Sequence, residues 1–315
     1  MKILIFGAGV IGTTCAWQMQ EAGHDVTLFV RPLRMVRYSH SGVAINFTDM
    51  RGGKKEEGQT VFRPKVIDKL MPSQAFDLII VSVRSNQWHD ALPYVAKYSG
   101  KAHILLMGNM WSHPGFVSKY LPRNRYFLGF PGLIAGGQTD NGINCFLFAN
   151  SFIMLGEPDG EKTERLEKTV ELFKTSGLQP LICRKMKDWL PTRYLVSALL
   201  PGLISKAGTT SLFVANKTLV KQYLMALKEG VKVCRKRNIG RVSLFPFNRF
   251  YLPSFILTGM IRRQFSPEMQ SALDAHMKHG GTEKIKQYHD VLRAGKSFRI
   301  AMPYWASFEK YMDFS

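Results

Sequence analysis

Glycines at a fixed spacing follow directly on an apolar run at the start of the chain. The motif Gly7-Ala8-Gly9-Val10-Ile11-Gly12 comes after Lys2 to Phe6, which is predicted to be a buried strand. In such a motif the first glycine allows a tight turn and the second lets the backbone approach a pyrophosphate. The third lets the next helix pack closely, with its N-terminus facing the phosphates. The spacing therefore predicts a dinucleotide site.

A basic residue stands where a second strand is expected to end. Thr13 to Ala22 is predicted to be a helix and Asp25 to Val30 the strand that follows it. An NAD-binding unit would next place an acidic residue on the ribose 2′-hydroxyl. This chain has Arg31 instead, with Arg34 and Arg37 close behind, and arginine pairs well with phosphate. The sequence thus predicts NADPH rather than NADH.

The segments that follow alternate between apolar strands and helices. Strands are predicted at 76–83, 103–107 and 126–130, with a helix at 86–98. This alternation is typical of an α/β fold with a Rossmann-type doubly wound parallel sheet. Asn141-Gly142 is a hairpin signal and predicts an antiparallel extension at one edge of that sheet.

The pattern becomes helical in the last part of the chain. Apolar residues recur at helical spacing in five segments, 163–175, 189–206, 217–238, 267–279 and 282–294. We therefore expect two domains: 1–183, an NADPH-binding Rossmann domain, and 184–315, an all-helical domain for substrate binding or dimerisation. The sequence leaves open whether the chain forms a homodimer.

Composition narrows the class of protein. The 315 residues are 45% hydrophobic and 21% charged, as in folded soluble proteins. Four scattered cysteines show no metal-type spacing, so we expect reduced thiols, no metal site and a cytoplasmic location. Met1 leads directly into the first strand, which leaves no room for a signal peptide, and no apolar stretch is long enough for an integral membrane segment.

The net charge of +20 is high for a metabolic enzyme. Such a surface favours anionic partners through a non-specific field. No nucleic-acid motif accompanies the charge, so no specific nucleic-acid partner is expected. We interpret most of the charges as solvated surface, and a minority as serving an anionic cofactor and a small anionic substrate.

The motifs together resemble the ketopantoate reductase (2-dehydropantoate 2-reductase) family over nearly the whole chain. Arg84 stands where that family has a lysine near the cofactor, and Gly108-Asn109-Met110 resembles its turn beneath the nicotinamide. Ser271 and Glu283 resemble its substrate-contacting serine and acid, with Met302-Pro303 at about the family's interval. The resemblance implies cofactor contacts at Gly7, Gly9, Val10, Ile11, Gly12, Arg31, Arg84 and Asn109. It implies catalytic contacts at Asn109, Ser271 and Glu283, in a cleft between the two domains.

The chain departs from the family at the catalytic lysine. Aligning on Trp189 puts Pro191 at that position, and aligning on Pro201 puts Thr192 there. Neither supplies the ammonium that would assist the substrate oxygen. Four residues are candidates for the role, which stays open among Arg193, Tyr194, Lys206 and His279.

Three functions are compatible with these features. The leading hypothesis is an NADPH-dependent oxidoreductase that reduces a carbonyl or imine of a small acid. The alternative is a non-catalytic NADPH-binding pseudoenzyme or redox sensor, and the third is a protein that binds anionic polymers or membrane surfaces. The aromatic and basic stretch 242–265 is compatible with helix-packing core, with an enlarged pocket or lid, and with a peripheral membrane contact.

Overall fold

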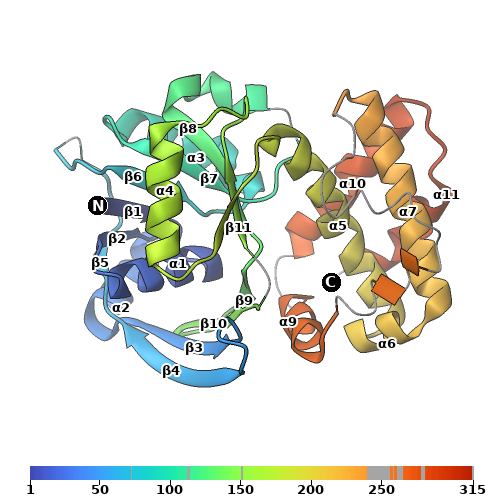
Figure 1. Ribbon diagram of the computed structural model, residues 1–315, viewed down its shortest axis with the longest axis horizontal. Helices are drawn as coiled ribbons and strands as arrows, with labels where there is room; N and C mark the ends of the chain where they lie inside the picture. Colours follow the sequence, from blue (N-terminus) through green and yellow to red (C-terminus); the bar gives the residue numbers. More distant parts are fainter. Residues whose placement is uncertain are drawn as a thin grey trace. The chain divides into compact units, whose positions relative to one another are not determined.

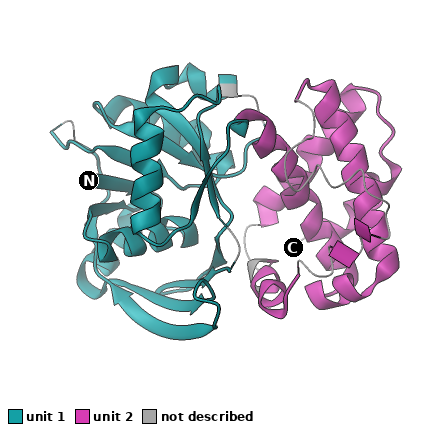
Figure 2. Cartoon of the chain, in the orientation of Figure 1, with its two compact units in different colours: residues 1–186 teal, residues 187–315 magenta. Residues whose placement is uncertain are grey.

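The computed structural model describes most of the chain as two compact units, Met1–Met186 and Lys187–Ser315 (Figure 2). The described residues are 1–71, 73–111, 114–149, 152–239, 256–257, 259–260, 265–277 and 281–313. His279 and most of 242–265, which the sequence analysis singled out, lie outside them. Each unit is described by itself.

An eight-stranded sheet organises the first unit (Figure 1). Its order is β12-β11-β8-β7-β6-β1-β2-β5, parallel from β5 to β8, with β11 antiparallel to β8. The strands are β1 Lys2–Phe6, β2 Asp25–Phe29, β5 Lys65–Ile67, β6 Leu78–Val81, β7 His103–Met107, β8 Tyr126–Pro131, β11 Ile153–Gly156 and β12 Pro180–Ile182. The helices are α1 Val10–Glu21, α2 Pro32–Ser41, α3 Trp88–Tyr98 and α4 Glu164–Thr175, with short 3-10 turns η1 Ser85–Gln87, η2 Pro114–Lys119 and η3 Arg123–Arg125. The predicted doubly wound α/β fold is confirmed.

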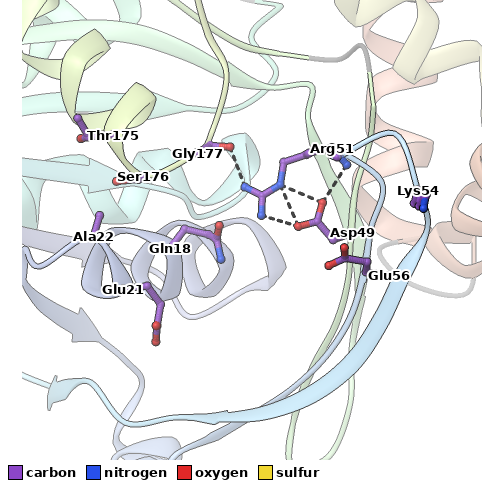
Figure 3. A pocket seen from close by; sticks show the side chains of 11 residues that line it. Gln18, Glu21, Ala22, Asp49, Arg51, Lys54, Glu56, Thr175, Ser176 and Gly177 are labelled. Carbon is purple, nitrogen blue, oxygen red and sulfur yellow. Dashed lines mark hydrogen bonds and ion pairs between the residues drawn. The ribbon is translucent and has the colours of Figure 1, made fainter.

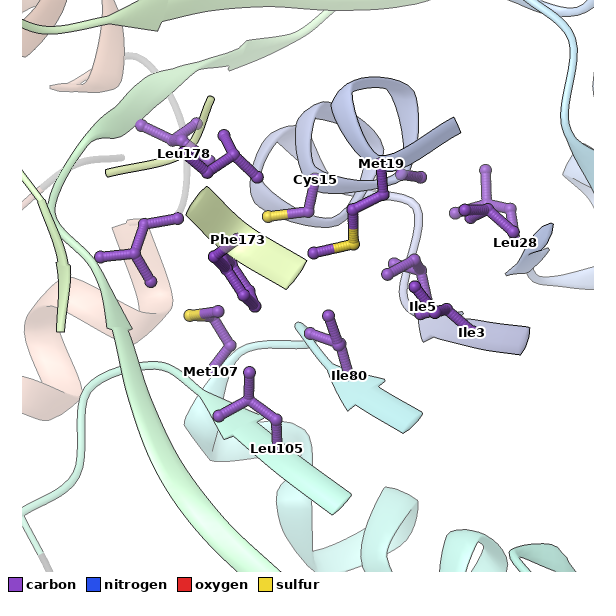
Figure 4. Close-up of a cluster of buried hydrophobic side chains, with 14 of the residues drawn as sticks. Ile3, Ile5, Cys15, Met19, Leu28, Ile80, Leu105, Met107, Phe173 and Leu178 are labelled. Atoms are coloured by element: carbon purple, nitrogen blue, oxygen red, sulfur yellow. The ribbon is translucent and has the colours of Figure 1, made fainter. Parts of the chain in front are cut away.

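The central strands are apolar because both of their faces are covered. A continuous cluster packs the side chains of β1, β2, β6 and β7 against α1 and α4 (Figure 4). Its labelled members are at most 2% exposed: Ile3, Ile5, Cys15, Met19, Leu28, Ile80, Leu105, Met107, Phe173 and Leu178. This packing holds the start of α1 directly over the end of β1.

A second sheet of four strands was not predicted. Its order is β4-β3-β10-β9, formed by β3 Val43–Asp49, β4 Glu56–Phe62, β9 Ile134–Gln138 and β10 Gly142–Leu147. Asn141-Gly142 does link an antiparallel pair, β9 and β10, but β10 then pairs with β3 and does not extend the main sheet. The predicted antiparallel extension of the main sheet is formed instead by β11, which pairs with β8. The reason is burial, since Ile143, Cys145 and Leu147 join the cluster that covers α1.

The second unit is helical throughout the part that the structure describes, as predicted. Its helices are α5 Met186–Ala207 (which begins one residue before the unit), α6 Thr210–Ala215, α7 Lys217–Lys236, α9 Pro267–Met277, α10 Gly281–Ser297 and α11 Pro303–Ala306, followed by the 3-10 turn η5 Glu309–Tyr311. The side chain of Asn216 caps α7 by accepting from the Leu219 amide at 3.1 Å. No helix among the described residues is both long and apolar enough to cross a membrane.

A buried carboxylate fixes α11 on α7. Glu229 is 6% exposed and accepts the amides of Tyr304 and Trp305, at 3.2 and 2.8 Å. Tyr288 donates to the Trp305 carbonyl at 2.6 Å. The Met302-Pro303 pair thus lies at the start of α11, where proline suits a first helical turn.

All four cysteines are buried, and none of them forms a disulfide. Burial raises the pKa of Cys15 and Cys234 to about 12, and burial raises that of Cys145 to about 11. These three thiols therefore remain protonated at neutral pH.

Candidate functional site

The predicted cofactor residues of the first unit lie in a row along one edge of the sheet. Neighbouring strands β2, β1, β6 and β7 run parallel, so their carboxyl ends meet at the same edge. Arg31 follows β2, the glycine motif follows β1, Arg84 follows β6 and Asn109 follows β7. Strand order changes direction between β1 and β6, and ligands of open α/β sheets bind at such a switch point.

Each glycine of the motif has a distinct geometry. Gly7 has φ +121°, and a Cβ there would lie 2.8 Å from Val83 Cγ1. A Cβ on Gly12 would collide with the Gly7 carbonyl oxygen and with Ser82 Oγ. A Cβ on Gly9 would meet nothing within 4 Å. Gly7 and Gly12 are therefore required by the protein's own packing, whereas Gly9 borders open space.

The first turn of α1 is suited to an anion. Its N-cap is Gly9, which provides no side-chain hydrogen bond, and no acidic residue occupies the turn. By contrast, α4 is capped by Thr163, and its first turn carries Glu164 and Glu167. The N–H groups at the start of α1 thus have no side-chain acceptor of their own, and the helix dipole favours negative charge there.

Three side chains brace the glycine loop, and two of them, Gln138 and Ser82, were missed by the sequence analysis. Gln138 Nε2 donates to the Ala8 carbonyl at 2.9 Å, and Arg34 Nη1 donates to the same oxygen at 3.3 Å. Arg34 Nη2 also donates to Gln138 Oε1 at 3.1 Å. On the other side Ser82 Oγ donates to the Gly7 carbonyl at 2.9 Å. Gln138 comes from β9, far along the chain, so no local pattern could have indicated it.

The three arginines after β2 therefore differ in role. Arg34 braces the loop, while Arg31 and Arg37 are exposed. Arg31 is the N-cap of α2 and precedes Pro32. Neither its guanidinium nor that of Arg37 forms an ion pair or side-chain hydrogen bond with any residue that the structure describes. A phosphate at the end of β2 would meet an uncommitted guanidinium.

The turns after β6 and β7 are held by other contacts. Trp88 Nε1 donates to the Val83 carbonyl at 3.2 Å, next to exposed Arg84, which is the N-cap of η1. The Gly108 amide donates to the Gly129 carbonyl at 3.1 Å and positions the partly buried Asn109. Both turns are fixed by the protein alone, before any ligand is considered.

In the second unit the predicted substrate residues lie on α9 and α10. Ser271 is exposed and its hydroxyl donates to the Pro267 carbonyl at 3.1 Å. Glu283 is partly exposed in the first turn of α10 and accepts from Gln287 Nε2 at 3.4 Å. Their roles stay predictions.

Glu283 lies close to a charged cluster that links α5 and α10. Tyr194 donates to Asp290 Oδ2 at 2.9 Å, and Asp290 also accepts Lys286 at 2.6 Å and Arg293 at 2.7 Å. Burial raises the pKa of Tyr194, and the nearby carboxylates of Asp290 and Glu283 raise it further. Tyr194 therefore stays protonated with its proton committed to Asp290, which makes it a weak proton donor.

The position aligned with the family's lysine is occupied by buried groups. Thr192 is 3% exposed and its hydroxyl donates to the Trp189 carbonyl at 2.7 Å. The next residue, Arg193, donates from Nη1 to Ser197 Oγ at 3.2 Å, and burial lowers its pKa. Lys206 donates to Gln222 at 2.8 Å and lies 5.1 Å from the Phe308 ring centre.

One buried lysine in this unit was not predicted. Lys284 is 5% exposed, directly follows Glu283 and donates from Nζ to the Met277 carbonyl at 3.0 Å. Its adjacency to Glu283 was the only signal in the sequence, and a lysine in the first turn of a helix is usually exposed.

An open hollow of about 550 Å³ lies elsewhere in the first unit (Figure 3). Arg51 pairs there with Asp49 at 2.6 Å and donates to the Gly177 carbonyl at 2.7 Å. Burial disfavours the charge of Asp49, but the hydrogen bonds from Arg51 outweigh it and lower the pKa. The hollow borders Gln18 to Ala22, the C-terminal end of α1, and is thus remote from the glycine loop at the other end.

Among the described residues, no group of three or more His, Cys, Asp or Glu side chains is arranged to hold a metal ion.

Comparison with known proteins identifies related sequences. The family described as "Ketopantoate reductase PanE/ApbA" matches residues 3–158. The uncharacterized oxidoreductase YkpB of Bacillus subtilis is 24% identical over 221 residues, which cover 68% of this chain and 65% of YkpB. The 2-dehydropantoate 2-reductase of Lactococcus lactis is 22% identical over 214 residues, 66% of this chain and 65% of that enzyme. The match thus spans just under two thirds of these relatives.

A solved structure shares the fold over the full length. The ternary structure of D-mandelate dehydrogenase with NADH and anilino(oxo)acetate has a TM-score of 0.76 and 18% identity. The alignment covers 99% of this chain and 97% of that one. At this identity the likeness shows the fold.

Proposed function

Because residues 3–158 match the family described as ketopantoate reductase PanE/ApbA, we propose that this chain is an NADPH-dependent oxidoreductase that reduces a carbonyl or imine carbon of a small acid. The observation that carries the proposal is the row of residues at the carboxyl edge of β2, β1, β6 and β7. The row offers, in order, a guanidinium, an anion-binding helix start, a second guanidinium and an amide.

The residues of the first unit fit NADPH as follows. The open space at Gly9 and the uncapped first turn of α1 suit the pyrophosphate. Arg31 pairs with the 2′-phosphate, because its guanidinium is exposed and uncommitted among the described residues. Asn109 follows β7, which lies two strands from β1 in the sheet, whereas Arg31 follows β2 on the other side of β1. The nicotinamide end of the cofactor is therefore expected near Asn109. When bound, the reduced nicotinamide supplies a hydride to an electrophilic carbon.

The helical unit is proposed to recognise the acid. Ser271 offers a hydroxyl on the exposed side of α9, and Glu283 lies at the start of α10. Arg193 is the charged group next to the family's lysine position, and a planar guanidinium binds a carboxylate or stabilises an alkoxide. A guanidinium remains protonated, so it stabilises charge without delivering a proton, and the proton on the product oxygen comes from water or another acid.

The test is NADPH oxidation with a panel of 2-oxo acids, followed at 340 nm. We expect turnover with at least one acid, and loss of more than 90% of it in Arg193→Met. The matched control is Arg184→Met, an exposed arginine of the first unit, with unchanged rates. NADPH binding without turnover of any 2-oxo acid or imine would leave only the non-catalytic alternative.

A further inference from the structure

One face of α7 carries only positive charge. Five basic residues recur along it, namely Lys217, Lys221, Lys228, Lys232 and Arg235, and we call them the α7 stripe (α7 in Figure 1). At about 100° per residue they fall within a sector of about 60° around the axis, along a line about 27 Å long. Lys228 is partly exposed and the other four are exposed. The stripe is thus a straight, accessible row of cations.

The stripe has one acidic residue on its own helix, Glu229. Its carboxylate is buried and accepts the two amides at the start of α11, and the charge of Lys232 acts on it. None of the four stripe lysines forms an ion pair with a residue that the structure describes. Lysines four apart with the same charge destabilise a helix, and the stripe contains two such pairs, Lys217 with Lys221 and Lys228 with Lys232.

Two other helices of this protein, α4 and α10, pair exposed cations with acids on the same helix. On α4, Lys168 pairs with Glu164 at 2.7 Å. On α10, Lys286 and Arg293 both pair with Asp290, at 2.6 and 2.7 Å. The row of cations on α7 therefore differs from the exposed cations of α4 and α10, which lie beside acids of their own helices.

The composition of the stripe indicates what it would bind. Membrane-surface helices insert an apolar face, but the apolar side of α7 is buried in its own unit. Met225, the residue between Lys221 and Lys228 on this face, is partly buried, and no aromatic side chain on the stripe could stack on a base. What remains is a row of ammonium groups suited to phosphates at regular intervals.

We propose that the α7 stripe binds the phosphate backbone of double-stranded nucleic acid without sequence preference. A duplex presents one negative charge for about every 1.7 Å of its axis, so a straight 27 Å row of cations meets several phosphates at once. The net charge of +20 adds a long-range attraction. The proposal is independent of the proposed reductase activity.

The test is fluorescence anisotropy of a labelled 20-base-pair DNA duplex with the full chain, at several salt concentrations. The stripe variant is Lys217→Gln, Lys221→Gln, Lys228→Gln and Lys232→Gln combined. The control combines Lys54→Gln, Lys69→Gln, Lys101→Gln and Lys119→Gln, four exposed lysines scattered over the first unit. Each variant removes four charges, so both have a net charge of +16 (20 − 4).

We expect the stripe variant to bind at least about 10-fold more weakly at low salt, with less than about 3-fold loss in the control. The slope of log affinity against log salt should fall by about two or more in the stripe variant. Saturating NADPH should not displace the duplex, and circular dichroism should show both variants folded. If the quadruple variant does not fold, the single variants Lys221→Glu and Lys232→Glu replace it.

Three outcomes would overturn the proposal. Equal losses in the two variants would assign binding to net charge alone. Displacement of the duplex by NADPH would assign it to the glycine loop and Arg31. Tighter binding to phosphatidylcholine vesicles containing phosphatidylserine, at equal salt and with the same lysine dependence, would make a lipid surface the partner.

Discussion

Two glycines three residues apart should respond oppositely to the same substitution. In Gly12→Ala the new Cβ collides with the Gly7 carbonyl oxygen and Ser82 Oγ, so the loop or α1 must shift. Overpacking of this kind costs about 1–3 kcal/mol. At roughly 2–4 °C per kcal/mol for a unit of this size, the melting temperature should fall by about 2–12 °C.

In Gly9→Ala the Cβ enters open space, and the backbone at φ −83° accepts alanine. Alanine is a poorer N-cap than glycine, but it also reduces the entropy of the unfolded chain, and the two effects roughly offset. The melting temperature should therefore stay nearly constant. The methyl group would instead keep the pyrophosphate from the first turn of α1. Losing one charge-assisted hydrogen bond costs about 1.5–3 kcal/mol, or about 10- to 150-fold in NADPH affinity.

Differential scanning fluorimetry and NADPH titration of both variants measure the two effects. Gly52→Ala is the control, because its Cβ also meets nothing within 4 Å but lies away from the loop. It should change neither quantity. A Gly9→Ala protein that binds NADPH as tightly as the parent would refute the assignment of the loop to the pyrophosphate, whatever the stability of Gly12→Ala.

Three further predictions concern catalysis and stability. Ketopantoate should be reduced slowly or not at all, because Thr192 and Pro191 supply no ammonium group. A positioned general acid typically raises the rate by about 10²–10⁴-fold. A kcat and KM for ketopantoate in the range of ordinary enzymes would contradict this prediction. Glu283→Gln should reduce turnover of any substrate that is found, with NADPH affinity and melting temperature unchanged; a melting temperature several degrees lower with unchanged kcat would show a structural role instead. Burial disfavours the charge of Glu157, but hydrogen bonds from Arg165 and Thr163 outweigh this effect and hold its pKa below the usual value. The free energy of unfolding that Glu157 contributes is therefore fully present above about pH 4.5. It is lost as the pH falls through the pKa that Glu157 has in the folded protein. Glu157→Gln should therefore lower the free energy of unfolding, measured in urea, by roughly 3–5 kcal/mol near pH 7, and the difference from the parent should shrink below pH 4.5. The control Glu161→Gln removes an exposed carboxylate and should cost less than about 0.5 kcal/mol. A difference that does not change with pH would exclude the ion pairs of Glu157 with Arg165 and Arg123 as its cause.

Local patterns were enough to predict much of the fold. The glycine loop and α1 follow from a few adjacent residues, and α4 begins one residue after the predicted start because Thr163 is its cap. The long helices α5, α7, α9 and α10 agree with their predicted ranges to within a few residues. In each case the information is apolar periodicity within a short window.

Long-range pairing could not be predicted in the same way. The second sheet depends on β3 meeting β10 about a hundred residues later, and Gln138 reaches the glycine loop only because β9 packs beside α1. The sequence shows each partner but not that they meet. Helix α6 was missed because its six residues are too few to show a helical period.

In the candidate site, too, some features could be predicted from the sequence and others depend on long-range contacts. Arg31 was predicted from its position after a strand, and Arg84 and Asn109 from the family resemblance; the structure puts these three positions along one edge of the sheet. The difference between Arg34, which braces Ala8, and Arg31, which does not, depends on tertiary contacts. The commitment of Tyr194 to Asp290, across α5 and α10, was equally invisible in the sequence.

The central claim is that this chain binds NADPH through Arg31 at the end of β2. The most direct measurement is the ratio of dissociation constants for NADH and NADPH, titrated by fluorescence, in the parent chain and in Arg31→Ala. One charge-assisted phosphate contact predicts a ratio of about 10 to 150 in the parent, collapsing toward one in the variant while NADH affinity stays nearly constant. Equal or tighter NADH binding by the parent chain, or an unchanged ratio in Arg31→Ala, would contradict the account.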